Sequence, residues 1–335
     1  MAEAKLLYLR RSDVADVVGD SCSVYVDAVR RALALHAQGR TVQPLKPYLR
    51  RNGNGHVADR IIAMPALLEG ERPIAGLKWI ASKHDNPGKR GLERASGLIV
   101  LNECETNYPV ALMEAGLVSG MRTAAVTVVG AQLLARPEAR ALGCVGCGFI
   151  GRLQIRALLE SRPALEEVSL FDLERRAAER LAGELEERLG GHVQICDSAE
   201  QCVRGADVVV TSTVTAQPYL EFAWLARGSF LSNISLLDVC DDVFLNADKV
   251  VVDDWDQCDR EGKPIHRLTQ AGLFSRERLH AELGEIVLGA RPGRESDDEI
   301  ILLNPMGLAI EDVAAAHAVY ELALERGAGT WLDLY

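Results

Sequence analysis

The sequence has little positive charge, no long apolar runs and no recognisable leader segment, and each of these absences excludes a class of protein. Its 335 residues carry 37 Lys and Arg against 48 Asp and Glu, a formal net charge of −11, with no basic stripe. A nucleic-acid partner is therefore not expected. No apolar run reaches the length of a membrane span, and Met1–Lys5 does not open a signal peptide. We expect a cytoplasmic protein.

Metal-binding cysteine pairs are also scarce. Cys144 and Cys147 have the C-x-x-C spacing, but a zinc site would need a second cysteine or histidine pair at suitable spacing. The remaining cysteines supply none; they are Cys22, Cys104, Cys196, Cys202, Cys240 and Cys258. We expect reduced, mostly buried cysteines and no bound metal.

The first third of the chain has the pattern of an α+β domain. An amphipathic helix is expected over residues 23–39, because its apolar positions recur at helical spacing and Gly39 ends it. Short strand-like runs separated by turn residues follow at 60–64, 74–81, 97–102 and 108–113. Their hairpin-like spacing predicts a largely antiparallel sheet.

From about Arg122 the pattern changes to alternating helices and strands. A helix is expected at 123–135 and another at 311–326, with strands near 141–146, 167–172, 193–196, 207–213, 228–235 and 248–254. This alternation predicts a doubly wound α/β fold with a mostly parallel sheet. The strand-like tail at 330–335 is expected to return to the first domain.

A glycine-rich turn is the most specific motif. Residues 146–151 follow the apolar run 141–145, precede a helical run, and read G-x-G-x-x-G. The first glycine allows the tight turn, the second lets the backbone approach a pyrophosphate, and the third lets the helix pack on the strand. The helix N-terminus then offers N–H groups to the phosphates. The candidate dinucleotide-binding residues of this turn are Gly146, Gly148, Phe149, Ile150 and Gly151.

Asp172 ends the next strand-like run, 21 residues after Gly151. A carboxylate there accepts hydrogen bonds from the ribose hydroxyls and repels a 2′-phosphate, which favours NAD over NADP. Arg175 and Arg176 follow closely and weaken that preference. We expect NAD as the cofactor. Asp172 belongs to its candidate site, together with Thr123, Thr213 and Asn233.

Lys78 and Arg122 are the basic residues whose positions need an explanation. Lys78 lies in an apolar strand, where a lysine needs an anionic partner or a route to water; it is either functional or an edge-strand lysine. Arg122 and Thr123 are expected to open a helix, where a cation is unfavourable unless the same place holds an anion. The alternative for Arg122 is a surface arginine paired with a nearby acid.

Three acids, Asp238, Asp241 and Asp242, follow the strand expected at 228–235. They fall at the carboxyl edge of the parallel sheet, where doubly wound folds bind ligands. An acid there can position water or shuttle a proton, and the sequence does not choose among the three. Residues 211–213 end another strand at this edge. Their backbone would line the cofactor; alternatively, their hydroxyls would hydrogen-bond to polar groups of the loop.

Basic residues gather in the first domain of this acidic chain. Most are expected to form a solvated face, and the alternative is a pocket for a substrate with several carboxylates. The candidate substrate-binding cations are Lys46, Arg50, Arg60 and Arg94.

These motifs, in this order, resemble the ornithine cyclodeaminase/mu-crystallin family over nearly the whole chain. The resemblance is carried by Gly76–Ile80, Asp85–Pro87, Met121–Ala125, the glycine turn, Ala281–Glu285, Pro292–Arg294 and Asn304–Asp312. It implies that Lys78 and Arg122 occupy substrate-carboxylate and catalytic positions and that Asp238 is the catalytic aspartate. The family's glycine-rich approach to that aspartate reads Ser235-Leu236-Leu237 here.

Four segments resemble one subgroup of the family in particular: residues 42–50, 58–65, 83–87 and 102–109. Cyclodeaminases tend to carry a glutamate just before Met-Pro, where this chain has Ile62 and Ala63. Met64 is a further candidate substrate-binding residue. The subgroup resemblance implies that NAD oxidises N-(2-amino-2-carboxyethyl)-L-glutamate at the glutamate Cα. Hydrolysis then gives 2-oxoglutarate and L-2,3-diaminopropionate, a siderophore or antibiotic precursor.

Other activities remain open from the sequence. The rival enzyme is an ornithine cyclodeaminase or another amino-acid or ketimine dehydrogenase of the family. A rival from a different class is a non-catalytic NADPH-binding protein of the crystallin type. Retention of Lys78, Arg122 and Asp238 together speaks against the non-catalytic protein.

The expected architecture is α/β, a doubly wound Rossmann domain plus an α+β substrate and dimerisation domain. Residues 1–121 with 312–335 are expected to form the substrate and dimerisation domain, and residues 122–311 the NAD-binding domain. The family resemblance implies a homodimer built through the first domain's sheet. A pyridoxal-phosphate-dependent synthase is the expected pathway partner.

Overall fold

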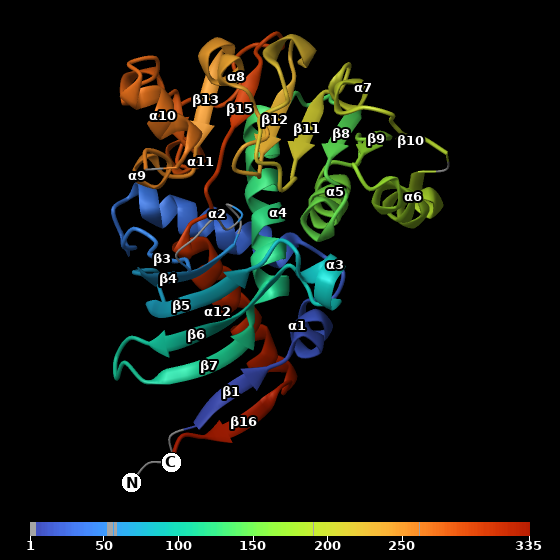
Figure 1. The fold of residues 1–335 in the computed structure, drawn as a ribbon. Coiled ribbons are helices and arrows are strands. Elements are labelled where there is room, and N and C mark those ends of the chain that lie inside the picture. The colour runs from blue at the N-terminus through green and yellow to red at the C-terminus, as the bar shows by residue number, and fades with distance from the viewer. Residues whose placement is uncertain (1–4, 52–55, 57–58, 190, 261) are drawn as a thin grey trace. The chain divides into compact units, whose positions relative to one another are not determined.

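The computed structural model describes the chain apart from residues 1–4, 52–55, 57–58, 190 and 261 (Figure 1). By packing, the chain divides into two units, Met1–Arg122 with Gly307–Tyr335, and Thr123–Met306. Compared with the division expected from the sequence, Arg122 and residues 307–311 join the first unit. Helix α12 (Ala309–Arg326) begins within that added segment and packs on the first unit's sheet.

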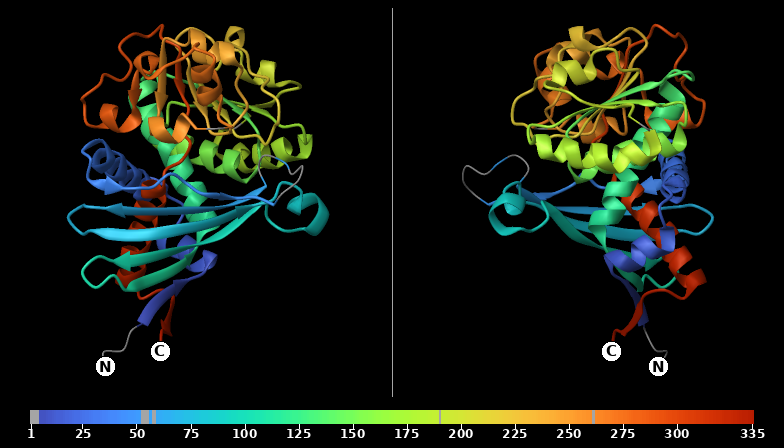
Figure 2. Two further views of the ribbon diagram at one scale, coloured as in Figure 1. Left: turned by 60° about the vertical axis from the view of Figure 1, so that its left-hand side comes forward. Right: turned by 90° about the vertical axis from the view of Figure 1, so that its right-hand side faces the viewer.

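The first unit is built on an eight-stranded sheet in the order β16-β1-β7-β6-β5-β4-β2, with β3 also paired to β4. The strands are β1 (Lys5–Leu9), β2 (Thr41–Val42), β3 (Tyr48–Leu49), β4 (Arg60–Leu68), β5 (Ile74–Ser82), β6 (Ala95–Glu103), β7 (Pro109–Glu114) and β16 (Thr330–Asp333). Strands β4 to β7 pair antiparallel, which confirms the expected sheet. The tail also returns as expected, because β16 pairs with β1 beside the chain's other end (Figure 2).

Helices cover one face of this sheet. They are α1 (Arg11–Val18), α2 (Ser23–Ala37) and α12, while the short α3 (Asn86–Arg90) follows β5. Helix α12 packs on β4, β5 and β6 and against α2. On β4, alternate residues from Met64 to Leu68 are buried, because side chains of a strand alternate between its two faces. On β5 the buried residues are Ile74 and Lys78, which share one face.

Helix α4 (Ala115–Leu134) begins well before Arg122, so the expectation that Arg122 and Thr123 open a helix is wrong. The Glu114 carboxylate caps the true N-terminus by accepting hydrogen bonds from the backbone N–H groups of Gly116 at 2.5 Å and Leu117 at 3.0 Å. This cap is invisible to a helix-propensity argument, since the first turns are rich in small residues and glycine. Arg122 therefore lies inside a helix, and the argument from the helix dipole does not apply to it.

Helix α4 also corrects the expectation that no apolar run has membrane length. By length and composition it could span a membrane, with a mean hydropathy of 1.4. However, 67% of that window is buried inside the protein, which is typical of a core helix.

The second unit contains an eight-stranded sheet in the order β10-β9-β8-β11-β12-β15-β13-β14. Its strands are β8 (Ala141–Val145), β9 (Glu167–Phe171), β10 (Val193–Ile195), β11 (Val208–Thr211), β12 (Phe230–Asn233), β13 (Lys249–Val252), β14 (Ala281–Glu282) and β15 (Ile301–Leu303). The neighbouring strands pair parallel, as expected for a doubly wound fold. Strands β14 and β15 were not among the strands expected from the sequence.

Helices surround this second sheet (Figures 1 and 2). They are α5 (Phe149–Ser161), α6 (Arg175–Leu189), α7 (Ala199–Val203), α8 (Asp241–Asn246), α9 (Trp255–Cys258), α10 (Pro264–Gln270) and α11 (Leu283–Val287). The strand order reverses at β8, which has β9 on one side and β11 on the other. Doubly wound folds bind their ligands at this reversal, beyond the carboxyl ends of the strands.

Candidate active site

Lys78 is buried in the middle of the first unit's sheet. Its side chain is 2% exposed, and its ammonium lies 2.6 Å from the Asp312 carboxylate and 3.1 Å from the Ser119 hydroxyl. Because β5 is flanked by β4 and β6, the edge-strand explanation is wrong. Burial lowers the pKa of Lys78 to about 7, although the Asp312 charge opposes the shift. An amine with that pKa can give or take a proton near neutral pH.

Arg122 shares the same acid. Its Nε donates to Asp312 at 2.7 Å and its Nη1 donates to Glu311 at 2.9 Å, while the residue is 7% exposed. The alternative interpretation of Arg122 was a surface arginine paired with a nearby acid. Arg122 is indeed paired with acids, but it is buried. Gly307 packs on it at a φ of +73°, and a Cβ there would lie 2.6 Å from Arg122 Nη1. The backbone at 307 is thus shaped around the guanidinium.

Glu311 and Asp312 are the functional residues that the sequence reasoning missed. Both are fully buried in the first turn of α12, where the Leu308 N–H donates to Glu311 at 3.0 Å. A possible signal was a pair of acids opening an otherwise apolar helix. No local pattern connects that helix to a lysine on β5, because the contact depends on how α12 packs.

Lys46 brings a third cation to this cluster. It is buried, and its ammonium donates to the Gly307 carbonyl at 2.7 Å. With Lys78 protonated, three cations and two carboxylates give a formal charge of +1. That excess suits one substrate carboxylate. Met64 pairs in register with Lys78 on the neighbouring strand and is also buried.

The remaining candidate cations lie at the far end of the same strands. Arg60 opens β4, and Arg94 directly precedes β6. The guanidiniums of Arg50 and Arg60 lie over the Tyr48 ring, 5.4 Å and 5.5 Å from its centroid. Arg94 donates to the Ser82 hydroxyl at 3.0 Å.

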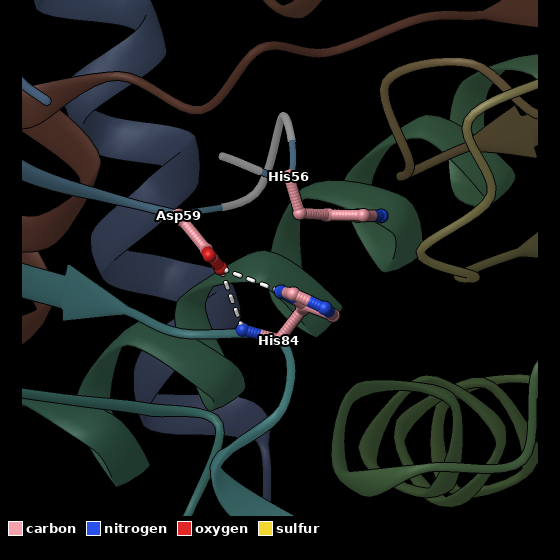
Figure 3. A group of neighbouring side chains, drawn as sticks. All are labelled: His56, Asp59 and His84. Carbon is pink, nitrogen blue, oxygen red and sulfur yellow. Dashed lines mark hydrogen bonds and ion pairs between the residues drawn. The ribbon is translucent and has the colours of Figure 1, made fainter. Parts of the chain in front are cut away.

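His56, Asp59 and His84 form a cluster near this end of the sheet (Figure 3). Their potential ligand atoms lie within 4.8 Å of one another. However, the Asp59 carboxylate already accepts hydrogen bonds from the Lys83 ammonium, from His84 Nδ1 at 2.9 Å and from the His84 backbone N–H at 2.8 Å. A metal ion would have to displace the Lys83 ammonium, so we interpret the cluster as an anchor between the ends of β4 and β5.

In the second unit, the glycine turn has the geometry that its motif predicts. Gly146 adopts a φ of +97°, and a Cβ on Gly151 would lie 1.9 Å from the Gly146 carbonyl oxygen. A Cβ on Gly148 would meet nothing within 4 Å, which leaves room for a ligand to approach the backbone. Phe149 and Ile150 form the first turn of α5, with Gly148 as its N-cap. The turn thus fits the pyrophosphate of a dinucleotide.

Asp172 directly follows β9 beside this turn. Its carboxylate accepts a hydrogen bond from the Cys147 N–H at 2.8 Å and from the Glu174 N–H at 2.8 Å. These bonds hold the Asp172 carboxylate beside the glycine turn. Arg175 lies 3.1 Å from Asp197 and 3.4 Å from Glu179, so acids already neutralise the nearer of the two arginines.

Asp238 is the most buried of the three acids at the carboxyl edge. It is fully buried, and it accepts hydrogen bonds from the Thr213 hydroxyl at 2.5 Å, the Thr213 N–H at 3.2 Å and the Ser235 hydroxyl. Burial raises its pKa, against the effect of these donors. Asp241 is instead paired with Arg267 at 2.6 Å, and Asp242 accepts the Phe222 N–H at 3.0 Å.

Asn233 and Thr123 occupy different surroundings. The Asn233 amide oxygen accepts from the Thr211 hydroxyl at 2.7 Å, and its amide nitrogen donates to Asn304 at 2.7 Å. Asn233 therefore ties together the carboxyl ends of β11, β12 and β15. Thr123 lies inside α4 and is half-buried.

The cysteines are free thiols, and most of them are buried, as expected. Cys144 Sγ donates to the Gly146 carbonyl, and Cys147 Sγ donates to the Phe171 carbonyl. These backbone contacts account for the C-x-x-C pair without a metal.

Comparison with known proteins gives one family and several full-length relatives. The model of the ornithine cyclodeaminase/mu-crystallin family matches residues 11–327. The chain is 52% identical over 333 residues to the N-((2S)-2-amino-2-carboxyethyl)-L-glutamate dehydrogenase of Staphylococcus aureus, covering 99% of each chain. It is 34% identical to an alanine dehydrogenase of Archaeoglobus fulgidus, covering 98% of each.

Solved structures resemble the fold over the same extent. An archaeal alanine dehydrogenase dimer with bound NAD is 32% identical, with a TM-score of 0.89, covering 99% of this chain and 100% of that one. The Δ1-pyrroline-2-carboxylate reductase of Thermococcus litoralis, in complex with NADH and L-proline, is 30% identical. Its TM-score is 0.90, covering 97% of this chain and 99% of that one.

Proposed function

Because this chain belongs to the ornithine cyclodeaminase/mu-crystallin family, we propose that it is an NAD-dependent oxidoreductase acting on an amino-acid C–N bond. Its proposed substrate is N-[(2S)-2-amino-2-carboxyethyl]-L-glutamate, which is cleaved to 2-oxoglutarate and L-2,3-diaminopropionate. The observation that carries the substrate assignment is the 52% identity to an enzyme of that name over 99% of both chains. The relative's name and the buried cluster of Lys78, Asp312 and Arg122 both support oxidation at an amino-acid C–N bond.

The second unit is the proposed NAD-binding domain, and NAD when bound accepts hydride from the substrate carbon. The open backbone at Gly148, the first turn of α5 and the Asp172 carboxylate support this assignment. We propose that Asn233 and Thr213 shape the carboxyl edge of the second unit's sheet beside the cofactor. Relatives of similar length crystallised with NAD or NADH support the same cofactor.

The first unit supplies the proposed substrate carboxylate site and the base. Arg122 and Lys46 hold the carboxylate next to the reacting carbon. Neutral Lys78 removes the proton from the substrate's secondary ammonium, which frees the nitrogen lone pair to form the C=N bond as hydride leaves. The pKa of Lys78 near 7 provides that neutral amine at physiological pH.

Asp238 is the proposed acid that directs water. Water adds to the C=N carbon, the C–N bond then breaks, and the diaminopropionate nitrogen leaves as an amine. The raised pKa of Asp238 suits a group that takes a proton from water and returns it to the leaving nitrogen. The sum is substrate, NAD⁺ and water giving 2-oxoglutarate, diaminopropionate, NADH and one proton.

We also propose that the protein is a homodimer formed through the uncovered face of the first unit's sheet. Trp79 and Leu98 pair in register on that face and are exposed, opposite the face that holds Lys78. Trp79→Glu should give monomers in sedimentation velocity, whereas Leu273→Glu, an exposed position on the second unit, should leave dimers. Equal behaviour of the two variants would contradict the proposed interface.

The cellular setting is proposed on the same basis. The protein acts in the cytoplasm, and its product feeds the assembly of a siderophore or antibiotic. A pyridoxal-phosphate-dependent synthase supplies the conjugate. If the synthase acts before this protein, the conjugate should accumulate in cells that retain the synthase but lack this protein, and it should be possible to purify it from them.

The test of the activity is turnover of purified protein with NAD⁺ and the conjugate. We expect NADH, 2-oxoglutarate and diaminopropionate in equal amounts, and no such yield from ornithine, proline or alanine. Ammonia release from ornithine with the conjugate untouched would assign the cyclodeaminase reaction instead. Asp238→Asn should abolish turnover and still bind NAD, because its polar contacts to Thr213 can persist.

A further inference from the structure

Two segments of the second unit run side by side at Asp238. Leu220 forms an isolated parallel bridge with Val239. The N–H groups of Tyr219 and Leu220 both donate to the Asp238 carbonyl at 3.0 Å, and the Cys240 N–H donates to the Leu220 carbonyl at 2.9 Å. In this register Tyr219 lies opposite Asp238, so the two side chains leave the paired segments on the same side.

Tyr219 places a hydroxyl beside the Asp238 carboxylate. The hydroxyl oxygen is buried, and within the described part of the chain no group bonds to it at ordinary hydrogen-bonding geometry. Burial raises the pKa of Tyr219 most, and the Asp238 charge raises it further. In return, the Tyr219 hydroxyl lowers the pKa of Asp238, against the effect of burial. The two side chains are therefore close enough to act on each other.

Two thiols also act on Tyr219, but they are uncharged near neutral pH. They belong to Cys144 in β8 and Cys202 in α7. A hydrogen bond to a neighbouring thiol, followed by burial, raises the pKa of each. The Tyr219 phenol is also protonated in this range, because burial raises its pKa. It can therefore donate its proton to a hydrogen bond with the carboxylate.

The Asp238 carboxylate has room for this donor. Its Oδ1 accepts from the Thr213 hydroxyl at 2.5 Å. Its Oδ2 accepts from the Thr213 N–H at 3.2 Å and from the Ser235 hydroxyl. A carboxylate offers about four lone-pair sites, two on each oxygen. Counted over the residues that the structure describes, one site on Oδ1 remains.

We propose that Tyr219 is a positioning residue, whose hydroxyl donates to Asp238 Oδ1, keeps the carboxylate ionised and fixes its orientation. This inference rests on the proposed role of Asp238. Asp238 must be ionised to take a proton from water, and burial opposes that state. Tyr219 offsets part of the burial effect and keeps its own proton throughout. Catalytic hydrogen bonds are often loose in the resting protein and tighten when ligands bind, which agrees with the geometry of this hydroxyl.

The direct test is titration of Asp238 in the full-length protein without substrate. The protein is isotope-labelled at its aspartate carboxyl carbons and titrated by NMR, and the Asp238 signal is the one missing from Asp238→Asn. Tyr219→Phe should raise the Asp238 midpoint by about one pH unit, the effect of one lost hydrogen bond to a charged group. Tyr320→Phe should leave the midpoint unchanged, since Tyr320 lies on α12 and burial is what raises its pKa.

Kinetics give a second readout that a purely structural role would not move. Turnover of Tyr219→Phe is divided by that of wild type at each pH, so that the titration of Lys78, common to both proteins, cancels. The ratio should fall by up to about ten-fold as pH decreases through the Asp238 midpoint, because the variant's carboxylate takes up its proton at a higher pH. The ratio of Tyr320→Phe to wild type should be independent of pH.

An unchanged Asp238 midpoint in Tyr219→Phe overturns the inference. A turnover ratio that is lowered by the same factor at every pH also overturns it, because such a loss would come from packing. Tyr219→Phe removes one oxygen atom and keeps the ring, so the space that the side chain fills remains filled and the variant should fold.

Failure of the proposed function gives a different result. The NMR titration needs neither NAD nor the conjugate, so it can be carried out even if wild type produces no NADH. A raised midpoint in Tyr219→Phe would then support the contact between Tyr219 and Asp238 while the assigned reaction is rejected. An unchanged midpoint rejects the contact whatever the reaction is.

Discussion

The Lys78 ammonium and the Asp312 carboxylate lie 2.6 Å apart, with side chains 2% and 0% exposed. Lys78 comes from an interior strand of a sheet, and Asp312 comes from the first turn of the helix that packs on that sheet. Asp312 also holds Arg122 at 2.7 Å. One buried carboxylate thus holds both of the cations to which we assign the chemistry.

Turnover should depend on the protonation of Lys78. Its pKa is lowered to about 7 by burial. Because the neutral amine is the proposed base, kcat should rise as pH increases through about 7 and then level off. Lys78→Arg keeps a positive charge but does not titrate in this range, so the rise should disappear along with most of the activity.

The control for this pH profile is Lys89→Arg, at an exposed lysine paired with Asp85. It should retain both the rise and the rate. A rise near pH 7 that survives in Lys78→Arg would mean that another group is the base.

Removal of the Asp312 charge should cost both stability and function. Asp312→Asn leaves Lys78 and Arg122 without their shared counter-charge. Breaking a buried pair by removing one partner costs roughly 3–5 kcal/mol, and the retained amide places the expected loss near the lower end. The pKa of Lys78 should fall below its present value, because Asp312 raises it.

Urea unfolding measures the loss of stability, with Glu321→Gln as the matched control. The Glu321 pair with Arg72 is exposed, so its loss should cost under about 1 kcal/mol. Equal destabilisation by the two substitutions would show that the Asp312 cluster is not stabilised by its charge.

Two glycines of the nucleotide turn should respond differently to alanine. Gly151→Ala should destabilise the protein, because its Cβ would lie 1.9 Å from the Gly146 carbonyl oxygen. Gly148→Ala should fold normally, since its Cβ would meet nothing within 4 Å. It should still weaken NAD binding, because the methyl group occupies the space needed by the pyrophosphate.

Thermal unfolding with and without NAD separates these two effects. The Gly148→Ala protein should keep the wild-type melting temperature and lose the upward shift that NAD gives. Tight NAD binding by this variant would show that the cofactor does not approach the turn at residue 148.

Cofactor preference should depend on Asp172. Wild type should favour NAD over NADP in kcat/KM, because the carboxylate at the end of β9 repels a 2′-phosphate. Asp172→Ser should lose most of this preference. Arg175→Ala should keep it, since Arg175 is already paired with Asp197 and Glu179. A wild-type preference for NADP would refute the assignment.

The local features of the sequence were sufficient for much of the fold. The glycine turn, the apolar strands and the amphipathic helices are set by residues close together in the chain, and the structure contains them where the patterns predicted. The start of α4 was predicted wrongly although its cap is also local. The Glu114 carboxylate that caps the helix directly precedes it, but the low helix propensity of the glycine-containing first turns hides that start.

The sequence alone determined that this chain has a dinucleotide turn, a doubly wound domain and a lysine that needs a partner. Only the tertiary structure decided that Asp312 is that partner. It also showed that the Asp238 carboxylate is buried and held by Thr213 and Ser235, whereas Asp241 and Asp242 have other partners. Charge and pKa depend on distance in space and on burial, and neither is fixed until strands and helices distant in the chain pack together.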